Sequence, residues 1–201
     1  MPGSIEVRPA SPDRWDDVVT VFGQRGDQVH CWCQWFRRTN AEFRDATDPD
    51  LRAALHAQVV RDGSASGVLA PGVLATRAGD PVGWCAVAPR PEYARLRTGR
   101  TMRTAGAADD LPDMRVWSVT CFVVRPDSRR SGVSAALLAG AVDWARGQGA
   151  RRVEAYPVDL AERPNVSSAE LFHGALSTFV AAGFQEIGRS SAARPVVRLD
   201  L

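Results

Sequence analysis

A turn rich in arginine and small residues joins an apolar run to a helix-like segment near residue 130. The apolar run ends at Val124, and apolar residues at helical spacing follow the turn through Leu138. Backbone N–H groups in the first turn of a helix have no intrahelical partner and carry partial positive charge, so they attract anions. Gly132 permits close backbone approach, and Ser134 is small. This order of residues predicts a cradle for a pyrophosphate group.

The turn resembles the signature of the GNAT superfamily of acyl-CoA-dependent N-acyltransferases, which is Gln/Arg-x-x-Gly-x-Gly/Ala at the start of a helix. Six residues carry the resemblance, with serine at the last position: Arg129, Arg130, Ser131, Gly132, Val133 and Ser134. The resemblance implies acetyl-CoA as the cofactor, with its pyrophosphate on this turn and its thioester carbonyl near the main chain of Phe122, Val123 and Val124. Donors there would stabilise the oxyanion of a tetrahedral intermediate.

The elements that must position this cradle alternate along the chain. Hydrophobic periodicity and turn residues predict strands at 4–8, 72–77, 82–87, 115–124, 152–156, 185–189 and 195–199, and helices at 11–23, 48–62, 132–146 and 169–182. The order β-α-α-β-β-β-α-β-α-β-β is the one that the GNAT resemblance implies. We therefore expect one mixed α/β domain over residues 1–201, with a mostly antiparallel sheet of about seven strands and four helices. Long connections at 88–112 and 157–167 are expected to cover the site.

The leaving thiolate needs an acid. In the resembling family a tyrosine often stands four residues before a Gly-Phe pair, but the matching residue here is Phe179. The alternatives are Tyr156, which we rank first, and three residues of the last predicted helix: Ser177, Thr178 and His173.

The amine proton needs an acceptor, and several side chains qualify. Glu154 shares a strand face with Tyr156, since side chains repeat every second residue. His30 competes because its ordinary pKa suits neutral pH. The other carboxylates that we keep open are Glu92, Asp109, Asp110 and Asp113.

An aromatic segment precedes the second predicted helix, and the resemblance places it at the acceptor pocket. Trp32, Trp35 and Phe36 are expected to form one wall that binds substrate. The nearby thiols of Cys31 and Cys33 favour buried reduced cysteines over a zinc site, because Cys85 and Cys121 fall in predicted strands. We expect no metal.

Composition narrows the partners. The chain has 201 residues, 45% of them hydrophobic, and a net charge of +2, with arginine supplying all 25 basic residues. No apolar run is long enough to span a membrane and no signal peptide precedes the first strand, so we expect a cytoplasmic protein that binds neither membrane nor nucleic acid. A homodimer is expected by analogy alone.

The segments Gly83–Arg90 and Glu154–Val158 look like those of a bacterial GNAT group with a Cys-Trp-Cys segment near the start. The leading hypothesis is transfer of an acetyl group to a primary amine of a small molecule. Acetylation of a protein or peptide, and a non-catalytic acyl-CoA sensor, remain alternatives.

Overall fold

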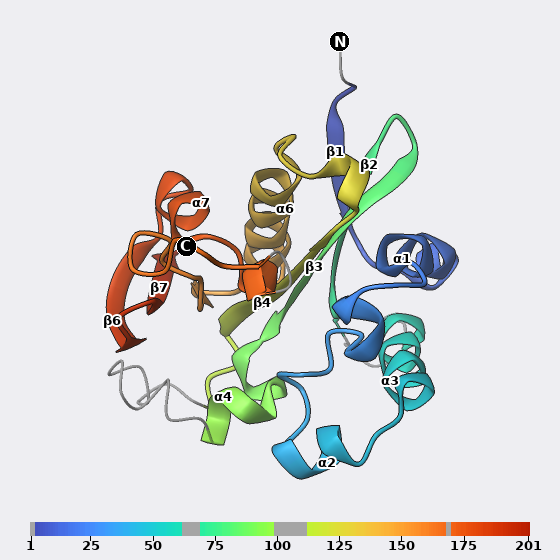
Figure 1. Cartoon of the computed structure of the whole chain (residues 1–201), viewed down its shortest axis with the longest axis horizontal. Coiled ribbons are helices and arrows are strands. Elements are labelled where there is room, and N and C mark those ends of the chain that lie inside the picture. Colours follow the sequence, from blue (N-terminus) through green and yellow to red (C-terminus); the bar gives the residue numbers. More distant parts are fainter. Residues whose placement is uncertain (1–2, 62–68, 99–111, 168–169) are drawn as a thin grey trace.

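One sheet of seven strands organises the computed structural model, which describes residues 3–61, 69–98, 112–167 and 170–201 (Figure 1). Across the sheet the strands are β1 (Ile5–Pro9), β2 (Gly72–Arg77), β3 (Asp80–Pro89), β4 (Val116–Val124), β5 (Arg152–Ala155), β7 (Arg194–Asp200) and β6 (Gln185–Ser191). Among the seven described strands, β4 and β5 are the one pair that runs in parallel. The predicted mixed, mostly antiparallel fold is confirmed.

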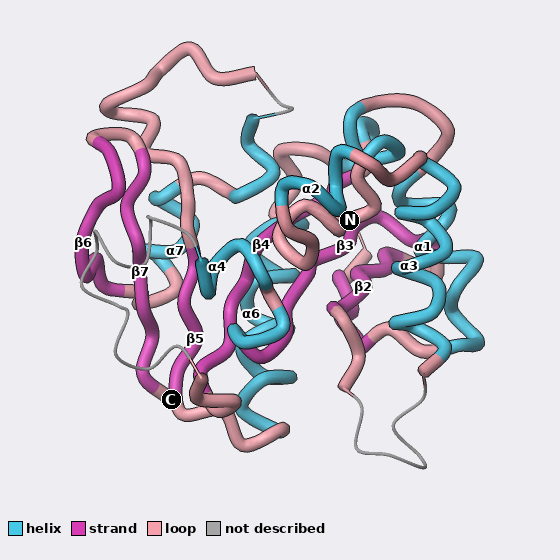
Figure 2. The backbone as a smooth tube through the Cα atoms, turned by 90° about the horizontal axis from the view of Figure 1, so that it is seen from below, coloured by secondary structure: helices cyan, strands magenta, loops and turns pink. Residues whose placement is uncertain are grey.

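Helices cover both faces of the sheet. The described α-helices are α1 (Trp15–Phe22), α2 (Asn40–Arg44), α3 (Asp48–Val60), α4 (Ala94–Thr98), α6 (Val133–Gly147) and α7 (Leu176–Ala181). Short 3-10 helices are η1 (Pro12–Arg14), η2 (Asp27–His30), η3 (Arg90–Glu92), η4 (Pro126–Ser128) and η5 (Glu170–His173). Figure 2 shows α1 and α3 at one side of the molecule and the β6–β7 hairpin at the other. The helix α6 packs on one face through Leu137 and Leu138, whereas Phe22 and Leu55 pack on the other against Trp84.

Local sequence signals explain most helix ends. Thr47 and Asp50 form a capping box at the start of α3, and Gly23 ends α1 with a φ of 69°. The helix predicted at 11–23 starts late, because residues 12–14 form η1 instead. The unpredicted α2 has its own capping box, between Thr39 and Glu42.

The helix predicted over 169–182 is wrong in its first half. Gly174 adopts a φ of 80°, which separates η5 from α7. The main chain here pairs with the segment after β5: the Val158 N–H donates to the Gly174 carbonyl, and the Leu176 N–H donates to the Val158 carbonyl, both at 2.9 Å. Tertiary hydrogen bonds therefore override the helical pattern. The helix α7 ends before Gly183, as predicted.

The connection predicted at 88–112 lies between Pro89 and Val116 and contains two short helices in its first part. Strand β3 continues to Pro89, which pairs with Trp117, and η3 and α4 follow it. Residues 99–111 lie outside the described residues. The connection 157–167 contains no helix or strand, apart from an isolated bridge at Val158.

Strand β4 carries a bulge in its pairing with β3. Ala86 pairs with Cys121 and Val87 with Val119, which leaves Thr120 as an extra residue in β4. On the other side, β5 pairs with β4 only up to Val119. The edge of β4 from Thr120 to Val124 is therefore without a β5 partner.

Candidate active site

The free edge of β4 presents main-chain donors. Arg125 donates its N–H to the Val82 carbonyl of the neighbouring segment at 3.1 Å. Successive N–H groups of a strand point to opposite sides within the sheet. The N–H groups of Phe122 and Val124 therefore point away from β3, toward the edge where β5 no longer pairs with β4. Val123 turns its main chain toward Trp84 of β3 instead. The short helix η5 lies beside this part of β4.

The predicted cradle lies at the end of the same strand. Gly132 begins α6 with a φ of 84°, and no side chain caps the first turn. A Cβ atom on Gly132 would have no neighbour within 4 Å, so the space above it is open. The Ser131 hydroxyl donates to the Ser128 carbonyl at 2.7 Å, and Arg77 donates to the Ser131 carbonyl at 2.9 Å. An uncapped helix start held open in this way fits a pyrophosphate.

The two arginines of the motif differ in conformation. Arg130 has a φ of 56°, a left-handed conformation that arginine rarely adopts. Arg129 has an extended backbone, and its Nε donates to the Val124 carbonyl at 3.4 Å. That contact links the cradle directly to the free edge of β4.

Tyr156 lies just past the last residue of β5. Its hydroxyl is 3.0 Å from the Ser118 hydroxyl, and its ring stacks on Phe36 with centroids 6.2 Å apart. Burial raises the pKa of Tyr156, and the negative charge of Glu154 raises it further. The phenol therefore keeps its proton at neutral pH and is available as a donor.

One buried polar atom lies close to the Tyr156 cluster, which consists of Tyr156, Ser118 and Phe36, and has no hydrogen-bond partner among the described residues. It is Nδ1 of His173, whose ring meets Phe36 edge-on with the ring centroids 5.4 Å apart. Burial, together with the smaller effect of the Arg194 charge, lowers the pKa of His173 to about 3. Unsatisfied buried polar groups are rare and often mark a site for a ligand or ordered water.

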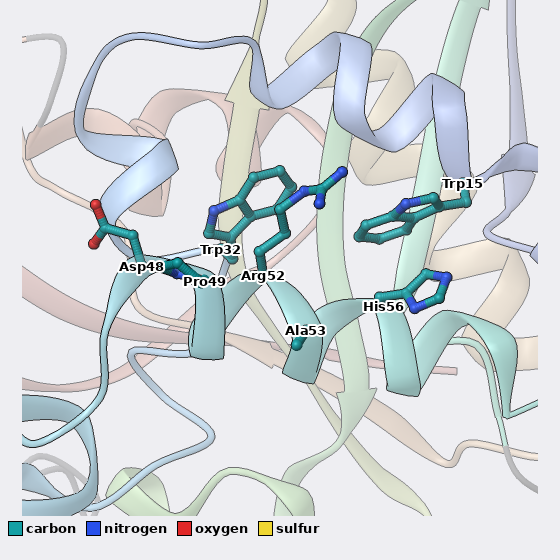
Figure 3. A pocket seen from close by; sticks show the side chains of 7 residues that line it. All are labelled: Trp15, Trp32, Asp48, Pro49, Arg52, Ala53 and His56. Atoms are coloured by element: carbon teal, nitrogen blue, oxygen red, sulfur yellow. The ribbon is translucent and has the colours of Figure 1, made fainter.

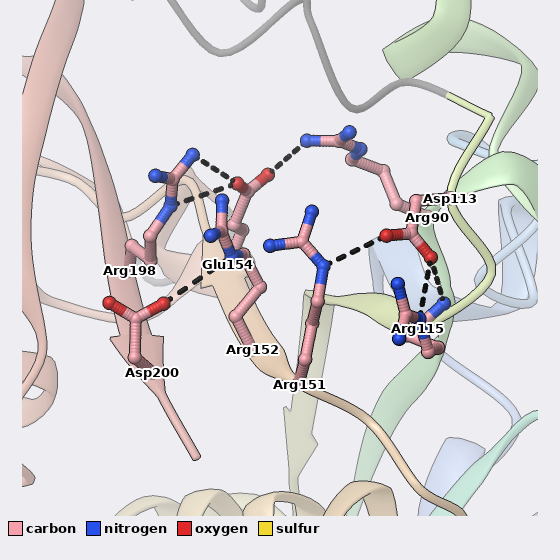
Figure 4. A network of polar contacts seen from close by, with 8 residues as sticks. All are labelled: Arg90, Asp113, Arg115, Arg151, Arg152, Glu154, Arg198 and Asp200. Atoms are coloured by element: carbon pink, nitrogen blue, oxygen red, sulfur yellow. Dashed lines mark hydrogen bonds and ion pairs between the residues drawn. The ribbon is translucent and has the colours of Figure 1, made fainter.

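Glu154 is the centre of a buried ion network (Figure 4). Its Oε2 lies 2.7 Å from Nη1 of Arg90, and both side chains are fully buried. Its Oε1 accepts from Nη2 of Arg198 at 2.9 Å. Each carboxylate oxygen of Glu154 therefore already accepts from a guanidinium, and this geometry holds the side chain in place.

A sequence model of the acetyltransferase (GNAT) family matches residues 29–174 of the chain. The chain belongs to the acetyltransferase (GNAT) family. It is accordingly an acyl-CoA-dependent N-acetyltransferase. A comparison with curated proteins found no match.

Solved structures share the fold of this GNAT chain at low identity. The GNAT domain of S. lividans PAT is 19% identical, with a TM-score of 0.58 over 99% of this chain and 92% of that one. A GCN5-related N-acetyltransferase from Kribbella flavida is 20% identical, with a TM-score of 0.55 over 98% of each chain. The PaiA N-acetyltransferase from Thermoplasma acidophilum, solved in complex with coenzyme A, is 13% identical, with a TM-score of 0.55 over 98% of this chain and 99% of that one.

The other predicted acids of this GNAT enzyme occupy α7 and its surroundings. Ser177 is exposed in the first turn of α7, and Thr178 is half-buried. Phe179 is fully buried and packs edge-on against Phe122 and Phe184, with centroids 6.0 and 5.3 Å away. The position where the family often has tyrosine is therefore part of the apolar core.

The remaining predicted bases do not gather at the β4 edge. His30 is exposed at the end of η2, with Nδ1 2.7 Å from a carboxylate oxygen of Asp48 on α3. Glu92 pairs with Arg37 at 2.7 Å. Hydrogen bonds from the Arg115 backbone N–H and, to a smaller extent, from the Arg151 side chain lower the pKa of Asp113 to about 2. Asp109 and Asp110 lie outside the described residues.

The predicted aromatic wall is wrong as a single surface. Phe36 reaches the Tyr156 cluster, whereas Trp35 is 41% exposed and lies under Arg95. Trp32 stacks on Phe22 in the opposite core. The reason is local: Trp32 and Cys33 both have positive φ, at 44° and 53°, and this turn sends consecutive side chains in different directions.

The cysteines are four free thiols. Cys33, Cys85 and Cys121 are buried, and burial raises the pKa of the half-buried Cys31 to about 12. Over the described ranges, no three His, Cys, Asp or Glu side chains group as a metal site. Within the same ranges, no helix is long and apolar enough to cross a membrane.

Sequence reasoning missed Ser118, Thr120, Arg90 and Arg198. Ser118 and Thr120 interrupt the apolar run of β4 with hydroxyl groups, and that polar interruption was the available signal. No local signal marked the two arginines among the 25 basic residues of the chain.

Proposed function

We propose that this GNAT enzyme transfers the acetyl group of acetyl-CoA to a primary amine of a small molecule. The observation that carries the proposal is the uncapped start of α6 at Gly132, which adjoins the free edge of β4. The first turn of α6 and residues Arg129–Ser134 would hold the pyrophosphate. The N–H groups of Phe122 and Val124 would then bind the pantetheine amides and the thioester carbonyl.

The residues around the fork between β4 and β5 would manage the protons. As the amine nitrogen attacks the carbonyl carbon, a C–N bond forms and negative charge develops on the oxygen facing the β4 donors. When the C–S bond breaks, Tyr156 would give its proton to sulfur while Ser118 orients the phenol. Glu154 would act as a positioning residue, and the amine proton would pass to water, because His30 on η2 is paired with Asp48 and is not among the residues at the fork.

Two features favour a small acceptor over a peptide. The connection 157–167 and η5 follow β5, and η5 lies against β4, where an open groove for a peptide would be needed. Phe36 also closes over Tyr156. The sensor alternative draws on Phe179, because its burial leaves no acid at the position where the family often has one.

The test is calorimetric titration with acetyl-CoA, followed by thiol release in the same preparation with a panel of small amines and a panel of peptides. The proposal expects binding and release that depends on a small amine. Release with peptides alone would reverse the substrate class, binding without any release would favour the sensor, and no binding would refute the cradle.

Four further expectations belong to this proposal: one domain over residues 1–201, a cytoplasmic location, a homodimer, and membership of the bacterial group with the Cys31–Cys33 segment. Cysteine at both positions with tryptophan between them is the feature that supports the last of these. Light scattering of the purified chain tests the homodimer.

A further inference from the structure

A surface cavity lies between α1 and α3, on the side of the sheet opposite α6 (Figure 3). Its volume is about 450 Å³, within the range of small-molecule sites. The lining residues are Trp15, Trp32, Asp48, Pro49, Arg52, Ala53 and His56. None of them belongs to the cradle or to the Tyr156 cluster.

Two indole rings form the walls of this cavity. The rings of Trp15 and Trp32 have centroids 6.1 Å apart and are inclined by 28°. Trp32 is only 5% exposed, because it stacks on Phe22 at 4.7 Å with the ring planes 3° apart. The edge of His56 meets Trp15 at 4.6 Å. The cavity therefore has a rigid aromatic wall that suits a flat ring.

The guanidinium of Arg52 projects over these walls. The Arg52 guanidinium lies 5.7 Å from the Trp15 ring centroid and 5.5 Å from that of Trp32, and Figure 3 shows it extending between the two. Among the described residues, no carboxylate lies within ion-pair distance of Arg52. The one carboxylate of the cavity, that of Asp48, is engaged by His30 at 2.7 Å.

We propose that this cavity binds a planar aromatic carboxylate, with its ring against the indoles and its carboxylate on Arg52. A guanidinium pairs with a carboxylate in a flat, two-point geometry, so an acid group in the plane of the ring satisfies both contacts together. A cationic ligand is disfavoured, because the Arg52 guanidinium already places a positive charge beside both indoles. The site is separate from acetyl-CoA binding, because the sheet stands between the cavity and the body of α6.

Titration calorimetry with benzoate and with indole-3-carboxylate tests the site, in the presence of saturating CoA. Benzamide removes the charge and cyclohexanecarboxylate removes the flat ring, so both should bind more weakly than the aromatic acids. Arg52→Gln should weaken binding about tenfold or more, as expected for loss of a charge-assisted hydrogen bond. Trp15→Leu should weaken it as well.

The matched control is Arg61→Gln. Arg61 directly follows α3 and is exposed, so the change removes the same charge from the same region without touching the cavity lining. Its affinity should equal that of the unmodified protein. Absence of binding by both acids at millimolar concentration overturns the proposal, and so does equal affinity in Arg52→Gln or for benzamide. Because CoA binding is measured separately, failure here is distinguishable from failure of the proposed function.

Discussion

The hydroxyl of Tyr156 and the hydroxyl of Ser118 lie 3.0 Å apart at the point where β5 separates from β4. Ser118 is paired with Glu154, and the last pair of the two strands is Val119 with Ala155. Tyr156 is thus the first residue beyond the parallel pairing. Because the pairing stops at Val119, the fork leaves the β4 edge from Thr120 to Val124 open and places a phenol at its start.

Tyr156→Phe should lower the turnover number about a hundredfold, because general acids contribute roughly 10²–10⁴-fold to such reactions. Affinity for acetyl-CoA should stay the same, since the cradle is untouched. Steady-state kinetics and calorimetry on one preparation check both expectations. Tyr93→Phe is the matched control: its hydroxyl is also buried, but its side-chain neighbour is Thr120 and not Ser118. Equal turnover in Tyr156→Phe and the unmodified enzyme would remove Tyr156 from the mechanism.

Gly132→Glu should weaken acetyl-CoA binding about a hundredfold or more. Two like charges about 4 Å apart repel by several kcal/mol at the effective dielectric near a protein surface. Gly149→Glu is the control, because Gly149 also has a positive φ, 78°, and free space around its Cβ position, but it lies beyond the other end of α6. If both variants lost affinity equally, backbone strain rather than charge would be responsible, and the cradle would lose its support.

Glu154→Gln should destabilise the fold by about 3–5 kcal/mol, because it breaks the fully buried ion pair between Glu154 and Arg90. Glu186→Gln removes a carboxylate from an exposed pair with Arg189 and should cost less than about 1 kcal/mol. Urea unfolding measures both. A Glu154→Gln protein of normal stability that has lost turnover would restore Glu154 as the catalytic base.

The features that could be predicted from the sequence depend on neighbouring residues. The open start of α6 follows from Gly132 and the turn before it, and the end of α1 follows from Gly23. The contacts that build the site join distant positions. Arg90 and Glu154 are 64 residues apart, and Ser118 and Tyr156 are 38 apart. Their meeting depends on strand register and on the bulge at Thr120, which periodicity does not encode.

Phe179 and the segment before it show a second limit. The pattern 169–182 reads as one helix, but pairing of Gly174 and Leu176 with Val158 divides it, and this pairing places His173 on η5 beside β4. Local propensity was outweighed by main-chain hydrogen bonds to another segment.

His173 makes folding stability depend on pH. In the unfolded chain its imidazole binds a proton below about pH 6.5, whereas burial lowers the pKa in the folded protein to about 3. Between these values the unfolded state binds more protons than the folded state. The contribution of the neutral His173 to folding stability is therefore complete above about pH 6.5 and is lost as the pH falls toward 3. Between the two pKa values, the free energy of unfolding should fall by up to about 1.4 kcal/mol for each pH unit, because one proton is taken up on unfolding.

Urea unfolding between pH 7 and 5 should therefore show a steeper loss of stability in the unmodified protein than in His173→Gln. In that range most carboxylates remain charged in both states, and His30 and His56 are common to both proteins, so the difference between the two profiles isolates His173. Parallel profiles would mean that the imidazole is protonated to the same extent in the folded and unfolded states. In that case His173 would be accessible to water, and the buried, unsatisfied nitrogen beside Phe36 would no longer mark a ligand site.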